Sequence, residues 1–427
     1  KSDDGHCVYT SDRVNEIIKN ELYDADGNLI ADNSSDITVR ANESNQEFSS
    51  VLNVQNPRLW NGTNDPYLYE LKSYLLSEDG KVYDTRSTKI GIREVEVNNG
   101  KFYLNGNEYK LKGVGFHQER GWIGNATTDE MKKSDINTVL EIGANAIRTA
   151  HYPHSQLTYN LADENGLIVW NEIPFYLLMA DTDEFRMSTK TMLQEMIRQG
   201  YNHPSISFWG IQNEVQSNSQ YAAFGPQFNV DLATLSEYMK ELASTAKSED
   251  SSRIVSQALY NGDTLISQAS NWTDPNLIDM SGVNKYTGWY SNVAKTDDSG
   301  RKQIYDELNT ELDQYKSILN VDTIAITEYG GGANTEQHET LGENFSWNGW
   351  PMNNQPFHPE EYQAYVHEAY YNALQARDDI PVAFVWSLFD CNVPENEIWD
   401  EVLGEYFGPE EEKIRIKECD VSDMQYY

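Results

Sequence analysis

SISFWGIQNE, residues 205–214, is an apolar run of strand length that ends in two polar residues. A continuous apolar run of this kind is typical of a strand covered on both faces, as in a parallel sheet packed between helices. Seven further runs resemble it: KLKGVGF (110–116), AIRTAH (146–151), LIVWNEI (167–173), RIVSQAL (253–259), LIDMSGVNKY (277–286), IAITEYG (324–330) and VAFVWSLFD (382–390). Together they predict eight buried strands.

Helical patterns separate these strands, at residues 128–143, 192–200, 231–244 and 359–374. Thr128 is placed to cap the first of these helices, and Gly143 to end it. Eight strands alternating with helices over about 300 residues predict a (β/α)8 TIM barrel. An open doubly wound sheet is the alternative, but no glycine-rich phosphate loop follows the first strand, which makes it less favoured.

The first 97 residues have a β pattern without a long helical period. DADGN (24–28) and SEDGK (77–81) lie between alternating segments. Asp-Gly pairs in that setting are typical of hairpin turns, because glycine accepts the positive φ that tight turns need. We therefore expect an immunoglobulin-like antiparallel β-sandwich over residues 1–97, incomplete at its start, followed by the barrel over residues 98–427.

The composition excludes several classes of partner. The chain carries 68 acidic against 32 basic residues, for a formal charge of −36, which repels nucleic acid and anionic membranes. No apolar run is long enough for a membrane span, so we expect a soluble protein. Three widely spaced cysteines, Cys7, Cys391 and Cys419, imply neither a disulfide framework nor a zinc cluster. The opening residues lack both an initiator Met and a signal-peptide core, so we interpret the chain as trimmed or incomplete, either cytoplasmic or exported.

Three carboxylates, Glu172, Glu214 and Glu328, end predicted barrel strands. Reactive groups of such barrels gather at the carboxyl ends of the strands. Glycoside hydrolysis needs one protonated and one ionised carboxyl group, because the transition state is cationic and the leaving oxygen needs a proton. Glu214 and Glu328 follow strands that face each other across the mouth, so they could reach the roughly 5 Å separation of a retaining site. A solvated rim residue or a salt-bridge partner is the alternative for any single strand-end Glu.

Two sequence blocks resemble glycoside hydrolase family 2, which contains β-galactosidases, β-glucuronidases and β-mannosidases. They are NAIRTAHYPHSQLTYNLADENGLIVWNE (145–172) and NHPSISFWGIQNE (202–214). ITEYGGG (326–332) is similar to the nucleophile strand of the family, and NPRLW, PYLYEL and KIGIREVEV are similar to the end of its immunoglobulin-like domain. The resemblance covers residues 8–390 and departs from the family at Thr158, where a large apolar residue is usual.

The resemblance implies catalytic roles for two residues and a substrate-binding role for a third. Glu214 takes the position of the acid/base and Glu328 that of the nucleophile, while Asn213 takes that of the amide that bonds the sugar 2-hydroxyl. A turn residue is the alternative for Asn213. Tyr286 matches an active-site tyrosine, which could hold Glu328 ionised and oriented; a packed strand-end aromatic is the alternative.

Five further residues are candidates for binding the sugar. His117 and His151 match family positions and are expected to contact sugar hydroxyls, although a lone histidine is more often a packing residue. Arg148 is expected either to do the same or to brace the nucleophile through a charge-assisted hydrogen bond. Trp386, and less strongly Trp289, could form an apolar platform under the sugar, with a place in the core as the alternative.

The sequence requires no cofactor. Some β-galactosidases of the family use Mg²⁺ near the acid/base, but no ligands for it match here, and no H-E-x-x-H pattern occurs. Residues 333–339 and 357–374, followed by VAFVWSLFD, resemble bacterial β-galactosidases more than other members. No Asn-x-Lys element that would read a glucuronate carboxylate follows the eighth strand. We therefore expect a β-galactosidase, with β-glucuronidase and β-mannosidase as alternatives.

Two departures from the family leave an inactive carbohydrate-binding relative as another alternative. We expect the chain to lack the N-terminal jelly-roll domain of the family, and residues 391–427 do not follow the family pattern. A carbohydrate substrate is the expected partner, and a homo-oligomer is possible.

Overall fold

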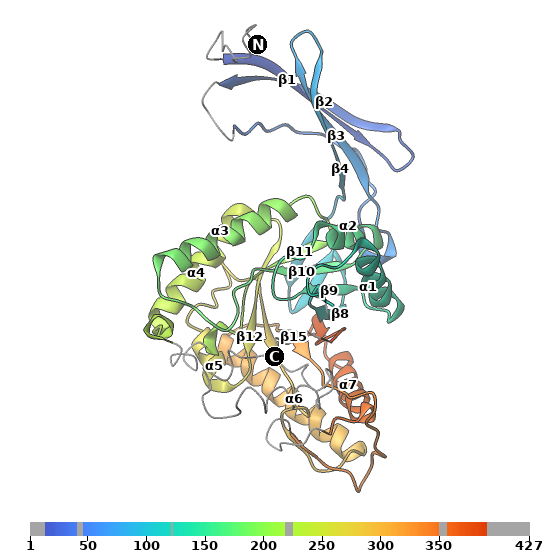
Figure 1. Ribbon diagram of the computed structural model, residues 1–427, viewed down its shortest axis with the longest axis vertical. Coiled ribbons are helices and arrows are strands. Elements are labelled where there is room, and N and C mark those ends of the chain that lie inside the picture. Colours follow the sequence, from blue (N-terminus) through green and yellow to red (C-terminus); the bar gives the residue numbers. More distant parts are fainter. Residues whose placement is uncertain (1–12, 41–45, 121–122, 218–224, 350–356, 391–427) are drawn as a thin grey trace. The chain divides into compact units, whose positions relative to one another are not determined.

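The computed structural model describes residues 13–40, 46–120, 123–217, 225–349 and 357–390 (Figure 1). The chain divides into two compact units. One ends at Arg93 and also takes in Asn202–Pro204, and the other comprises Glu94–Tyr201 and the chain from Ser205 onward. This break lies shortly before the predicted boundary at residue 97, which stays a prediction. The predictions made for Cys7, Cys391, Cys419 and residues 391–427 fall outside the described residues.

The N-terminal unit contains a four-stranded antiparallel sheet in the order β2-β1-β3-β4. The strands are β1 (Arg13–Tyr23), β2 (Leu29–Arg40), β3 (Tyr69–Ser77) and β4 (Val82–Ile90). Both predicted hairpin turns are present, with Gly27 at φ 82° and Gly80 at φ 85°. A 3-10 turn, η1 (Gly62–Asn64), lies in the connection from β2 to β3. The antiparallel N-terminal domain predicted from the turns is thus confirmed.

The second unit is built on a closed barrel of eight parallel strands, in the order β10-β11-β12-β13-β15-β17-β8-β9. The strands are β8 (Leu111–Phe116), β9 (Ala146–Thr149), β10 (Ile168–Glu172), β11 (Ile206–Asn213), β12 (Ile254–Tyr260), β13 (Met280–Asn284), β15 (Ala325–Tyr329) and β17 (Val382–Val385). Seven of them lie within the predicted runs, and β12 extends one residue beyond its run, 253–259. The (β/α)8 barrel is therefore confirmed, and the open doubly wound sheet is excluded.

Helices surround the barrel (Figure 1). They are α1 (Asp129–Glu141), α2 (Gln156–Asn165), α3 (Asp183–Gly200), α4 (Leu232–Glu249), α5 (Asp263–Ala269), α6 (Asp298–Leu319) and α7 (Glu360–Gln375). The hydroxyl of Thr128 accepts a hydrogen bond from the backbone N–H of Met131 at 3.3 Å, which is the predicted cap of α1. Gly143 follows at φ 78° and ends that helical segment.

Several shorter elements also belong to this unit. A three-stranded antiparallel sheet, β5 (Val95–Asn98), β6 (Lys101–Leu104) and β7 (Asn107–Glu108), precedes the barrel. A two-stranded sheet joins β14 (Asn292–Val293) to β16 (Trp347–Asn348), and a 3-10 turn, η3 (Pro226–Phe228), precedes α4. Among the described residues, no helix combines the length and the apolar character needed to cross a membrane.

Burial of whole strands explains why the sequence forms this barrel. Every residue of β10 and β11 is buried, as expected for strands covered by side chains on both faces. Gly210 allows the two strands to lie close together beside the candidate site. A Cβ atom on Gly210 would lie only 2.6 Å from the Cβ of Glu172, so any larger residue there would displace that carboxylate.

Candidate active site

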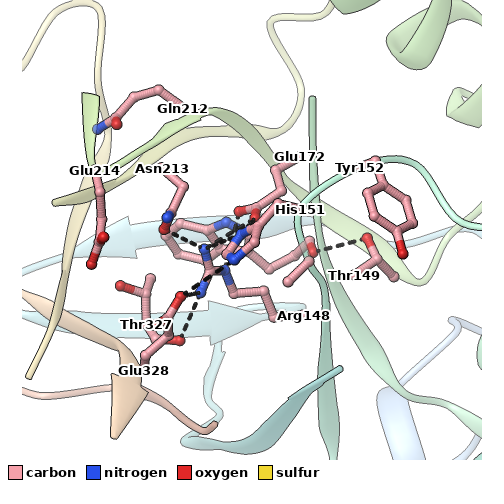
Figure 2. Close-up of polar contacts among 12 residues, drawn as sticks. Arg148, Thr149, His151, Tyr152, Glu172, Gln212, Asn213, Glu214, Thr327 and Glu328 are labelled. Atoms are coloured by element: carbon pink, nitrogen blue, oxygen red, sulfur yellow. Dashed lines mark hydrogen bonds and ion pairs between the residues drawn. The ribbon is translucent and has the colours of Figure 1, made fainter. Parts of the chain in front are cut away.

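The three carboxylates predicted at strand ends meet at one end of the barrel (Figure 2). Glu172 is the last residue of β10, Glu328 lies in β15, and Glu214 directly follows β11. The backbone of Glu214 has φ 58°, in the left-handed region that non-glycine residues seldom occupy. Its N–H donates to the carbonyl of Ala258 at 2.9 Å, which fixes the turn. Strain of this kind gathers at functional sites, and here it sets the direction of one carboxylate.

Arg148, in β9, joins the strands beneath these carboxylates. The side chain is fully buried, and all five of its N–H groups have an oxygen acceptor. Nε and Nη2 donate to the two carboxylate oxygens of Glu172 at 3.1 and 3.0 Å. Nη1 donates to Oε1 of Glu328 at 2.7 Å and to the carbonyl of Thr327 at 3.1 Å. The second hydrogen of Nη2 is donated to Oδ1 of Asn213 at 2.8 Å. The guanidinium therefore holds Glu328 and Asn213 in a fixed relation.

Glu328 receives one donor on each carboxylate oxygen. Arg148 donates to Oε1, and the hydroxyl of Tyr286 donates to Oε2 at 2.7 Å. Burial, and next the negative charge of Glu328, hold the pKa of Tyr286 well above its usual value. The tyrosine therefore stays a donor across the working pH range, and the carboxylate keeps one orientation.

Glu214 has a different environment. Its Oε1 accepts a hydrogen bond from Nδ2 of Asn284 at 2.8 Å, and the same Nδ2 also donates to Oδ1 of Asn213 at 3.0 Å. Burial of the carboxyl group, and next the negative charge of Glu328, raise the pKa of Glu214 to about 8. Glu214 thus has the raised pKa that a general acid needs in order to be protonated at neutral pH.

Asn213 is held with its amide in a defined orientation. Its Oδ1 accepts from both Arg148 and Asn284, so its Nδ2 is the atom that could donate to a substrate hydroxyl. Asn284 is oriented in turn, because Thr327 donates from Oγ1 to its Oδ1 at 2.7 Å.

An aromatic cluster adjoins the carboxylates. The ring of His151 stacks on Trp386, with centroids 5.2 Å apart, and on Tyr176, with centroids 5.4 Å apart. His117 meets His151 edge-on at 5.5 Å, and its Nδ1 lies 3.1 Å from the hydroxyl of Tyr152. Burial, and next the neighbouring His151, lower the pKa of His117 to about 3. His117 is therefore neutral at physiological pH and could offer its ring to a hydroxyl group without adding charge.

Of the predicted site residues, Trp289 lies apart. It is 1% exposed and stacks on Trp347, with ring centroids 4.8 Å apart. Trp347 donates from Nε1 to the carbonyl of Trp289 at 2.8 Å. The structure thus places Trp289 in a packed aromatic cluster, which is the core alternative stated for it. Trp386, by contrast, packs on both predicted histidines.

Three residues around the carboxylates had no predicted role. Asn284 links Asn213 to Glu214, Thr327 orients Asn284, and Tyr176 stacks on His151. Asn284 ends β13 two residues before Tyr286, so its strand-end position was a readable signal. Among the described residues, no group of three or more His, Cys, Asp or Glu side chains is arranged to hold a metal ion.

Replacing Arg148 by methionine is expected to lower the free energy of unfolding by about 3–5 kcal/mol, because two buried carboxylates lose their counter-charge. The matched control is Arg198→Met, since Arg198 pairs with Glu249 on the surface and such pairs contribute at most about 1 kcal/mol. Urea unfolding curves of the two variants and the parent chain measure both effects. Equal shifts of the two midpoints would contradict the structural role assigned to Arg148.

Comparison with known proteins agrees with this geometry. Residues 95–408 match the sequence model of "Glycosyl hydrolases family 2, TIM barrel domain", and residues 7–93 match "Glycosyl hydrolases family 2". A β-glucuronidase of Bacteroides fragilis is 35% identical over 347 residues, which are 79% of this chain and 44% of that protein. A β-galactosidase of Thermoanaerobacter pseudethanolicus is 34% identical over 180 residues, or 42% of this chain and 24% of that protein.

A solved structure is similar over most of the chain. It is Bacteroides uniformis β-glucuronidase 2 covalently bound to cyclophellitol-6-carboxylate aziridine, with a TM-score of 0.74 and 27% identity. The match covers 89% of this chain and 42% of that protein. The chain thus spans less than half of the length of each of these three proteins.

Proposed function

Because the chain belongs to glycoside hydrolase family 2, we propose that it hydrolyses terminal β-D-glycosides by double displacement, with Glu328 as the nucleophile and Glu214 as the acid/base. One observation carries this assignment. Both carboxyl groups belong to a single hydrogen-bonded network, in which Glu328 accepts from Arg148 and Tyr286 while the pKa of Glu214 is raised to about 8. A rim carboxylate or a simple salt-bridge partner has no need of such a contrast.

In the first step, a carboxylate oxygen of Glu328 forms a bond to the anomeric carbon. The bond from that carbon to the glycosidic oxygen breaks, and the departing oxygen takes the proton of Glu214. In the second step, Glu214 takes a proton from water, and the water oxygen displaces Glu328 from the anomeric carbon. Two inversions give a sugar with retained configuration, and both carboxyl groups return to their first state.

The charge of Glu328 helps Glu214 to change from a general acid in the first step to a general base in the second. The negative charge of Glu328 is one cause of the raised pKa of Glu214. That charge disappears when Glu328 becomes an ester, so the pKa of Glu214 falls in the intermediate. An acid that is protonated at neutral pH in the first step thereby becomes a base in the second.

The neighbouring residues would bind the sugar. The Nδ2 of Asn213 would donate to the 2-hydroxyl, a contact that strengthens as the ring flattens in the transition state. His117 and His151 would contact further hydroxyls, and Trp386 would supply the apolar surface on which a sugar ring packs. Arg148 and Tyr286 would keep the nucleophile in place. These assignments follow the positions of the side chains around the two carboxylates.

For the substrate, the relatives favour β-D-glucuronides, the alternative in the sequence analysis, over the β-galactosides expected there. The B. fragilis β-glucuronidase matches 79% of the chain, whereas the T. pseudethanolicus β-galactosidase matches 42%. β-Galactosidase remains the second candidate, because no Asn-x-Lys element follows the eighth strand in the sequence. The stretch in which that element was sought lies mostly outside the described residues.

We expect the chain to release nitrophenol from p-nitrophenyl β-D-glucuronide faster than from the matching galactoside and mannoside. The three substrates are compared by kcat/KM, with Glu328→Gln as the control for contaminating enzymes. Faster turnover of the galactoside would overturn the choice of sugar while leaving the mechanism intact. A folded chain that turns over none of the three would favour the inactive carbohydrate-binding relative.

A further inference from the structure

Glu172 is a fully buried carboxylate for which the double-displacement mechanism has no use. It is 0% exposed and lies at the end of β10, where it contacts Arg148 and His151. Its Oε2 accepts from Nε of Arg148, and its Oε1 accepts from Nη2 of Arg148 and lies 2.7 Å from Nδ1 of His151 (Figure 2). A buried charge is costly, which points to a role for Glu172 beyond neutralising Arg148.

The contact with His151 defines where the imidazole carries its proton. Burial alone would raise the pKa of Glu172, but the charge of Arg148 and the hydrogen bond from His151 lower it below the usual value. Glu172 is therefore ionised and can only accept hydrogen bonds. A bare Nδ1 at 2.7 Å would set two lone pairs against each other, so Nδ1 must carry the hydrogen.

Arg148 does not compete for this nitrogen. Its Nη2 lies 3.3 Å from Nδ1 of His151, but both Nη2 hydrogens already have oxygen acceptors, on Glu172 and Asn213. The ring is also fixed in direction, because it stacks on Tyr176 and Trp386. The other ring nitrogen, Nε2, consequently points to the nucleophile and lies 3.8 Å from Oε1 of Glu328.

We propose that Glu172 is a positioning residue that holds His151 in the tautomer with its hydrogen on Nδ1, so that Nε2 is presented beside Glu328 as an acceptor for a donating sugar hydroxyl. This inference rests on the proposed function for its substrate and deepens it. The opposite tautomer would place an N–H group against the nucleophile and would offer the sugar hydroxyl a donor instead of an acceptor.

The charged and titratable groups that face His151 come from several strands. Glu172 and Arg148 lie on β10 and β9, Glu328 on β15, and His117 directly after β8. His117 is neutral at physiological pH and meets His151 edge-on. Of the acceptors, Glu172 is the one within hydrogen-bond distance of a ring nitrogen of His151, and it therefore determines the tautomer.

Nitrogen NMR on the full chain tests the proposal without any substrate. With ¹⁵N-labelled histidine, the signals of His151 are assigned by their loss in His151→Gln. We expect a protonated Nδ1 and a bare Nε2 at pH 7.5, and a shift of population toward the Nε2–H tautomer in Glu172→Gln. Glu130→Gln, on the exposed surface of α1, should leave the signals unchanged. A parent spectrum with the hydrogen on Nε2, or on both nitrogens, would overturn the proposal even if Glu172→Gln does not fold.

Kinetics then test the consequence. Glu172→Gln is expected to lower kcat/KM by about 10- to 100-fold, the range for a hydrogen bond to a charged group. In the His151→Gln background the same change should have a much smaller effect, because the two residues act as a unit. Equal effects in the parent chain and in His151→Gln would show that Glu172 acts on Arg148 alone and would contradict the proposal. The expected tautomer without turnover of any glycoside would instead contradict the proposed function and leave the role of Glu172 standing.

Discussion

Glu328→Ala is expected to lower kcat by about 10⁴-fold or more, the scale seen when a nucleophile is removed from an enzyme. Without Glu328, no carboxylate oxygen is positioned to attack the anomeric carbon, and Tyr286 and Arg148 lose their shared acceptor. The measurement is the rate of nitrophenol release under saturating substrate. Glu336→Ala, an exposed residue that follows the same strand, is the matched control and should retain the parent rate.

Azide distinguishes a lost nucleophile from a damaged fold. In Glu328→Ala the space left by the carboxylate opens the face from which the anomeric carbon is attacked. Azide entering there would displace the nitrophenolate in one inversion, so the product should be the α-glycosyl azide. Recovery of nitrophenol release with an α-configured product identifies Glu328 as the nucleophile. A β-configured azide would mean that the anion attacked an intermediate formed on another residue.

Glu214→Ala is expected to show the second large effect, one that depends on the leaving group. General acid catalysis contributes about 10²- to 10⁴-fold, so the kcat/KM of a methyl β-glycoside should fall by that factor. The kcat/KM of the nitrophenyl glycoside should fall much less, because nitrophenolate departs without a proton. Comparing the two substrates in parent and variant measures the difference. An equal loss for both would argue that Glu214 serves the fold and not proton transfer.

The pH dependence of kcat/KM tests the role of Glu214 independently. Because the pKa of Glu214 is raised to about 8, the acid is protonated at neutral pH and loses its proton as the pH rises through that value. The kcat/KM of the parent chain should therefore fall above about pH 8. In Glu214→Gln, measured with the nitrophenyl substrate, this basic limb should be missing. Persistence of the limb in the variant would assign it to another group.

Much of the fold could be predicted because strands of a closed barrel are buried on both faces and are therefore visible as continuous apolar runs. The candidate site followed, because its carboxylates lie at the ends of those runs. Three helices, α2, α5 and α6, were missed, and α2 and α6 were missed for different reasons. α2 offers only a few buried positions among polar residues, whereas α6 buries Ile304, Leu308 and Leu312 at helical spacing, so its period was readable in the sequence.

Other features depend on contacts that no single segment encodes. Trp289 and Trp386 both follow barrel strands, yet Trp289 packs on Trp347 and Trp386 packs beside His151. Asn284 bridges Asn213 and Glu214 only because the register of three strands brings the amides together. The choice of sugar depends on even fewer contacts. The similarity to β-glucuronidases changed the expected substrate from β-galactosides to β-glucuronides.

Covalent trapping tests the central claim most directly. The intact chain is incubated with cyclophellitol-6-carboxylate aziridine, the compound bound covalently in the B. uniformis structure, digested, and mapped by tandem mass spectrometry. The account predicts one label, on Glu328 in the peptide that contains ITEYGGG, and no labelling of Glu328→Gln. If the compound does not react because the site prefers galactosides, the galacto-configured aziridine should place the label on the same residue. A label on Glu172 or Glu214 would contradict the assignment of the nucleophile.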